Sequence, residues 1–170
     1  METCYANAIA AVFYLAMHRI VGRKGGHPDF CDIRERIVDE YGYEGAYTNK
    51  VLQNVSGEYR LHYVEVDGNG ARQALNERRP VVARFIWYEE EVERYKKFFR
   101  KNPKGTLRKD DLRGVTGNKA SGHAVVMTRI SPRGITFMNS WGEKFANGGF
   151  FSVENENVLR GMKFYDVYWL

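Results

Sequence analysis

Apolar residues in the first third of the chain recur at helical spacing. The segment from Cys4 to Val21 is apolar nearly all round, which is typical of a helix buried in the middle of a domain. Thr3 stands where an N-cap is expected, and Gly22 to Gly26 would end the helix. Two further helices are predicted, one from Asp29 to Tyr41 and a shorter one from Tyr47 to Val55. The N-terminal part of the protein is therefore expected to be helical.

The rest of the chain changes to the short β-branched and aromatic runs of strands. Helices followed by strands indicate an α+β protein of two lobes, with a cleft where the lobes meet. We expect one domain over residues 1–170, with a mainly helical lobe at 1–58, a mainly β lobe at 59–170 and a basic insertion of helix and loop at 89–113. Strands are predicted at Leu61 to Val66, Pro80 to Trp87, His123 to Ile130, Ile135 to Asn139, Gly149 to Val153 and Phe164 to Trp169, and helices between them at Ala71 to Glu77 and Glu89 to Arg100.

Composition supports a folded domain, since 44% of the residues are hydrophobic and 28% are charged. The formal net charge of +5 would suit a nucleic-acid partner. However, nine of the 26 basic residues and only two of the 21 acidic residues lie between Arg94 and Arg113, so the rest of the chain is slightly acidic. No RNA- or DNA-binding motif accompanies this basic segment, and a solvated helix and loop is the simpler interpretation. Nucleic acid is not expected as a partner, but beside a cleft the segment would favour acidic peptides.

The two cysteines, Cys4 and Cys31, are too few for the disulfide framework of a small secreted protein, although one bridge remains open. A low cysteine content favours an intracellular compartment without determining one. The apolar segment from Cys4 to Met17 is shorter than the roughly 20 residues that span a bilayer. It also follows Glu2 instead of the positive leader of a signal peptide. We expect neither a membrane span nor a leader, and the sequence carries no signal for an oligomeric state.

Metal and cofactor sites have little support in the sequence. Cys4, Cys31, His18 and His27 are potential zinc ligands, but the paired Cys-x-x-Cys or His-x-x-x-His spacing of zinc sites is absent. The segment from Asp67 to Gly70 resembles a turn more than a calcium loop, which needs a longer acidic series. Cys31 is predicted to be a core residue of the second helix, and no metal or cofactor is expected.

Three residues far apart in the sequence could form a nucleophilic site. Cys4 begins the buried helix, where unpaired amide groups and the helix dipole stabilise a thiolate. His123 stands at the start of a strand, from which its ring could reach the cleft as a base. Asn139 could orient that ring by accepting its N–H, and the indole of Trp141 could shield the bond from water.

The segments that hold these residues resemble, in the same order, the papain and cathepsin family of cysteine peptidases. Glu2 to Ala8 is similar to the start of the nucleophile helix, and Ser121 to Val125 to the histidine strand. Asn139 to Gly142, with Gly148 to Phe150, is similar to the asparagine loop and the strand after it. The resemblance implies a papain-like fold, with a helical lobe, an antiparallel β-barrel-like lobe and an active-site cleft between them.

The resemblance also implies a reaction, the hydrolysis of peptide bonds in a peptide or protein substrate through a thioester acyl-enzyme. A Cys4 thiolate paired with a protonated His123 would attack the carbonyl, and His123 would then protonate the leaving amine and activate water. Asn139 would complete the catalytic triad. Supporting roles are implied for Tyr5 after the nucleophile, Gly45 where an extended substrate is held, Gly122 before the histidine and Trp141 over the contact between His123 and Asn139.

One family feature has no counterpart in this sequence. A glutamine six residues before the nucleophile completes the oxyanion hole of the family, but only three residues precede Cys4 here. Losing one such donor can cost about 10²- to 10³-fold in turnover. The chain is then a piece of a longer protein, or its activity is weak, or the donor comes from elsewhere. Two alternatives stay open: a papain-like binding module without turnover, and a related thiol deamidase or acyltransferase.

Overall fold

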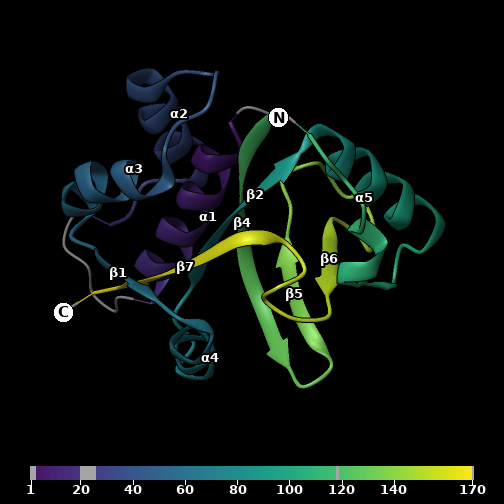
Figure 1. Ribbon diagram of the computed structural model, residues 1–170. Coiled ribbons are helices and arrows are strands. Elements are labelled where there is room, and N and C mark those ends of the chain that lie inside the picture. The colour runs from purple at the N-terminus through teal and green to yellow at the C-terminus, as the bar shows by residue number, and fades with distance from the viewer. Residues whose placement is uncertain (1–2, 20–25, 118, 170) are drawn as a thin grey trace.

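The computed structural model describes residues 3–19, 26–117 and 119–169, and it shows helices packed around one sheet (Figure 1). The helices α1 Cys4–His18, α2 Phe30–Tyr41 and α3 Thr48–Val55 come first, followed by the 3-10 turn η1 Ser56–Tyr59. The strands are β1 His62–Val66, β2 Val81–Tyr88, β3 Thr106–Leu107, β4 Ala120–Ser131, β5 Gly134–Met138, β6 Phe150–Val153 and β7 Arg160–Tyr168. Helix α4 Gly68–Asn76, helix α5 Glu89–Lys101 and the 3-10 turn η2 Lys109–Leu112 lie between strands.

The strands form a seven-stranded sheet in the order β1-β7-β2-β4-β5-β6-β3. Neighbouring strands are antiparallel except for β3 and β6, which run parallel. The expected α+β class is confirmed. Within the described residues the sheet is open, so the strand-rich part is not a closed barrel.

Helix α1 is buried along most of its length, which explains its nearly continuous apolar sequence. Ile9 and Phe13 are fully buried, and the helix packs against α2 and β4. Thr3 precedes the helix, but its side chain makes no capping hydrogen bond, since Oγ1 accepts one from Arg34 of α2 at 3.3 Å. Arg34 also donates to Asn7 at 2.7 Å and so ties the start of α1 to α2. No helix in the described ranges has the length and hydropathy needed to cross a membrane.

A second core lies on the opposite face of the sheet. Alternate residues of β2 point to the two faces, because Val82 packs in the core under α1 whereas Phe85 packs in the second core. Helix α5 covers the second core with Tyr95 and Phe99, while Arg100 is exposed. Strands β2 and β4 contribute to both cores and therefore join the helical and strand-rich parts of the protein.

The predicted helices and strands are present within a few residues, with four differences. The turn predicted at Asp67 to Gly70 is wrong, because helix α4 begins at Gly68 and Asp67 is its N-cap. Helix α1 ends at His18 with Arg19 as its C-cap, and the last two residues of the helix predicted to Val21 lie outside the described residues, as does its predicted end apart from Gly26. Strand β3 was missed because two residues leave no periodicity. The core position predicted for Cys31 is wrong, since its side chain is exposed. The buried face of α2 is formed by Ile33, Ile37 and Val38 instead.

Burial along α1 leads to a first prediction, which compares two residues of this helix. Ile9→Ala removes a fully buried side chain, so we expect the free energy of unfolding to fall by about 2–5 kcal/mol. Leu15→Ala is the matched control, because Leu15 is 45% exposed and its loss should cost less than about 1 kcal/mol. Urea denaturation of both variants measures the difference, and equal losses would contradict the packing of α1.

Candidate active site

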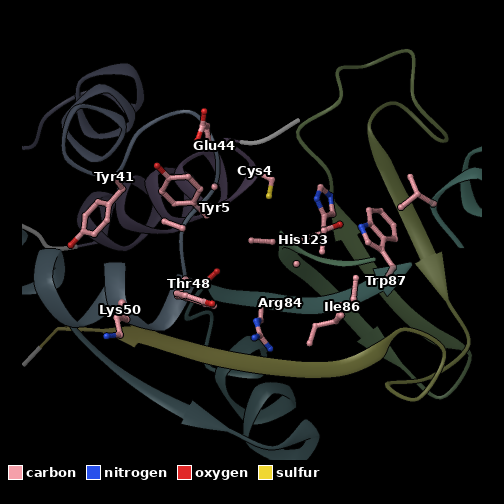
Figure 2. Close-up of a pocket in the computed structure, with 18 of the residues that line it drawn as sticks. Cys4, Tyr5, Tyr41, Glu44, Thr48, Lys50, Arg84, Ile86, Trp87 and His123 are labelled. Carbon is pink, nitrogen blue, oxygen red and sulfur yellow. The ribbon is translucent and has the colours of Figure 1, made fainter. Parts of the chain in front are cut away.

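A pocket of about 910 Å³ opens between the start of α1, the segment 41–50 and strands β2 and β4 (Figure 2). Cys4 lies on its α1 side and His123 on its β4 side, and Figure 2 shows the sulfur and the imidazole facing each other. Tyr5, Gly45, Gly122 and Trp141 also line this pocket. All the predicted site residues except Asn139 thus line one cavity, and Asn139 is hydrogen-bonded to His123.

Cys4 is the first residue of α1 and is only 8% exposed. Burial raises the pKa of its thiol, because a thiolate loses the solvation of water. Backbone hydrogen bonds at Ala124, Tyr5 and Cys4 itself lower the pKa and offset part of that effect. Since Ala124 follows His123 in β4, the sulfur lies against the strand that carries the imidazole.

The hydrogen bonds of Asn139 determine which nitrogen of His123 carries the proton. The backbone N–H of Ser140 donates to Asn139 Oδ1 at 2.9 Å, which identifies this atom as the oxygen of the amide. His123 Nε2 lies 2.9 Å from the same oxygen and must therefore be the donor. In the neutral ring the free lone pair is then on Nδ1, which leaves Nδ1 as the atom that can accept a proton.

Two aromatic residues that sequence reasoning missed complete the surroundings of this pair. Trp87, near the end of β2, stacks on the His123 ring with centroids 4.9 Å apart and an angle of 20°. Tyr95 of α5 accepts a hydrogen bond through Oη from Asn139 Nδ2 at 3.2 Å. The helical spacing of Tyr95 and Phe99 in the basic segment could have indicated a buried face there.

Trp141 packs over the same cluster. Its ring centroid is 5.4 Å from that of His123 and 5.6 Å from that of Tyr95. Lys96 Nζ lies 5.6 Å from the centre of the Trp141 ring. Trp141 Nε1 is buried and has no hydrogen-bond partner within the described residues. These apolar rings exclude water from the imidazole, and burial lowers the pKa of His123 to about 4 although the hydrogen bond to Asn139 raises it.

The other predicted site residues hold the walls of the pocket. The Tyr5 hydroxyl donates to the Gly42 carbonyl at 2.6 Å and fixes the start of α1 to the end of α2. Gly45 adopts a φ of 95° in the segment beside the pocket, and Gly122 pairs with Ile86 across β2 and β4. Neither cysteine is bridged, so the disulfide that the sequence left open does not form. In the described ranges no three His, Cys, Asp or Glu residues are placed to hold a metal ion.

Comparison with known proteins identifies the fold. No family model and no curated protein matches the sequence. Solved structures do match, among them xylellain, a cysteine protease from Xylella fastidiosa, with 16% identity and a TM-score of 0.64 over 99% of this chain and 80% of that one. A cysteine protease of Carica candamarcensis bound to E-64 matches with 14% identity and a TM-score of 0.64. Bromelain from Ananas comosus, also bound to E-64, matches with 13% identity and a TM-score of 0.63. Both matches cover 99% of this chain and 90% of the other. The expected papain-like fold is confirmed.

The hydrogen bond from Asn139 to Tyr95 leads to a second prediction. Tyr95→Phe leaves a buried amide donor without a partner, so we expect the free energy of unfolding to fall by about 1–3 kcal/mol. Tyr14→Phe serves as control, because the Tyr14 hydroxyl makes no hydrogen bond within the described residues and this loss should be near zero. Chemical denaturation measures both, and an unchanged Tyr95→Phe variant would show that the bond contributes nothing.

The buried imidazole leads to a third prediction, made in a Cys4→Ala background where no thiolate faces the ring. We expect a His123 pKa of about 4, measured by NMR titration of the imidazole. At pH values between about 4 and the 6.5 of the unfolded chain, His123 is protonated to a greater extent in the unfolded state than in the folded state. The free energy of unfolding should therefore fall by about 3 kcal/mol as the pH drops through that window. This fall should disappear with His123→Gln in the same background, and a pKa at or above 6.5 would refute the effect of burial.

Proposed function

We propose that this chain, which has the papain-like cysteine-protease fold, is a cysteine peptidase with Cys4 as nucleophile, His123 as base and Asn139 as the residue that orients the base. One observation carries the proposal. The Nε2–H of His123 is bound to Asn139, so the unprotonated Nδ1 is left for the pocket in which Cys4 lies. A thiol and an imidazole placed in this way match the requirements of nucleophilic catalysis.

The two reactive groups are best treated as one titrating pair. Burial disfavours a thiolate at Cys4 and an imidazolium at His123 when either charge is alone. Transfer of the Cys4 proton to His123 creates both charges together, and their attraction offsets the loss of solvation. In the proposed reaction the sulfur attacks the carbonyl carbon of a peptide bond as this proton moves to His123 Nδ1.

The later steps also pass a proton through His123. His123 gives it to the nitrogen of the leaving amine, the C–N bond breaks and a thioester on Cys4 remains. His123 then takes a proton from water while the water oxygen attacks the thioester carbon. The C–S bond breaks, the carboxylic acid is released, and His123 returns the proton to the Cys4 sulfur. The backbone N–H of Cys4 supports the negative charge on the carbonyl oxygen, because the first residue of a helix has no acceptor for its N–H within the helix.

Competition between the two cysteines of the chain tests this function, and forms the fourth prediction. The epoxide E-64 should modify Cys4 at least about 100-fold faster than Cys31, which is an exposed thiol and an internal standard for ordinary reactivity. His123→Gln should abolish the difference, since the base that accepts the Cys4 proton is lost. Mass spectrometry of tryptic peptides measures both rates, and slower modification of buried Cys4 than of Cys31 would argue against an activated nucleophile.

Turnover needs a separate assay. We expect the protein to cut denatured casein under reducing conditions and the Cys4→Ala variant to leave it intact. Binding of casein without fragments would indicate a binding module, and a mass gain at glutamine side chains would indicate deamidation. Either result, obtained with a reactive Cys4, would replace peptide hydrolysis by one of these functions.

A further inference from the structure

A cationic side chain lies in the same pocket as Cys4 and His123. Arg84 is in β2, where it pairs with Ala124 of β4, the residue that follows His123. Residues directly opposite in antiparallel strands share a face of the sheet, so Arg84 projects to the α1 side. Figure 2 shows its guanidinium on the pocket wall formed by β2, with Ile86 on the same strand. Val82, two residues earlier on this face, is fully buried, so Arg84 marks the place where the core ends and the pocket begins.

The guanidinium of Arg84 has no acidic partner among the residues that the structure describes. Its residue is half-buried, yet no carboxylate of the described residues lies within ion-pair distance of it. Arg79, in contrast, is paired with Asp166 at 3.0 Å. The β7 residue opposite Arg84 is Lys163, a second cation, which is paired with Glu65 at 3.3 Å. Because Glu65 is paired with Lys163, and no ion pair to Arg84 exists among the described residues, the Arg84 guanidinium is available to a bound anion.

The other charges of the pocket leave this wall positive. Lys50 of α3 is an exposed lining residue, while the lining carboxylate, Glu44, lies on the other side of Cys4 and Tyr5 from Arg84 in Figure 2. Helix α5 contributes Val92 to the lining and none of its basic residues. The positive charge of the pocket lining therefore comes from Arg84 and Lys50, and not from the segment that holds most of the excess charge of the sequence.

We propose that Arg84 binds the carboxylate of an Asp or Glu side chain in the substrate, so that the protein selects peptides with an acidic residue close to the bond that Cys4 attacks. The inference rests on the proposed function, because it assigns the substrate class of the same pocket. A guanidinium can bind a carboxylate through two parallel hydrogen bonds, and partial burial reduces the competition from water. A substrate with an apolar residue in this place would leave the Arg84 guanidinium unpaired and partly desolvated.

The test uses short quenched fluorescent peptides in which a single Glu, or the isosteric Gln, is moved through successive positions. We expect kcat/KM for Glu to exceed that for Gln by about tenfold or more at one position near the cut and to equal it elsewhere. Arg84→Gln should bring this ratio to about one, and Arg84→Glu should invert the preference toward a Lys peptide. Arg100→Gln, an exposed cation of α5 outside the pocket lining, is the matched control and should keep the ratio of the unchanged protein.

Binding separates this inference from the proposed function. The same peptides are titrated into the Cys4→Ala variant by fluorescence anisotropy, with and without Arg84→Gln. Tighter binding of Glu than of Gln peptides, lost with Arg84→Gln, supports the inference even if no peptide is cut. Efficient cleavage with equal Glu and Gln rates overturns the inference and leaves the peptidase function intact. Absence of a Glu preference in both assays, or a preference that survives Arg84→Gln, also overturns it.

Discussion

The packing of α1 against β4 is the contact on which the site depends. Cys4 and His123 are 119 positions apart in the sequence, and the roles proposed for them require these two elements to meet. The small side chains of Ala6 and Ala10 are fully buried and allow the helix to approach the sheet closely. The first turn of α1 lies at the edge of the core between the helix and the sheet, and Cys4 there lines the pocket. The following turns of α1 are buried in this core. Stability and site geometry are therefore properties of one interface.

Burial works both for and against the chemistry of this pair. Apolar neighbours disfavour an isolated charge on either group, as the raised pKa of Cys4 and the lowered pKa of His123 indicate. The same neighbours make each fixed dipole more effective, because the local dielectric constant is low. The amides at the start of α1 and the Asn139 oxygen are such dipoles, and Tyr95 holds the Asn139 amide from its other side. Helix α5, which the sequence marks mainly by its charge, thus supports the site through its buried face.

Local pattern and motif chemistry were enough to predict part of this arrangement. The periodicity of α1 and of the β-branched strands is strong because each is buried against another element, so the helices, most strands and the fold class followed from it. The segments around Cys4, His123 and Asn139 indicated the pair that the pocket brings together. Trp87, Tyr95 and Arg84 could not be assigned in the same way, since their roles depend on strand register and on the packing of α5. The position of Cys31 was missed because a small apolar residue fits either side of an amphipathic helix.

The location of charge matters more here than its amount. The basic residues of α5 that face solvent, such as Lys97 and Arg100, would act on a substrate of the proposed peptidase through water and salt, which screen charges over about 10 Å. Arg84 is one residue, but it is half-buried on the pocket wall and lacks a carboxylate partner among the described residues. A single cation held at short range, in a site that excludes part of the water, discriminates between ligands better than several solvent-exposed cations outside it. For the proposed peptidase, the net charge of the sequence is therefore a poorer guide to specificity than the ion pairs of each charged residue in the pocket.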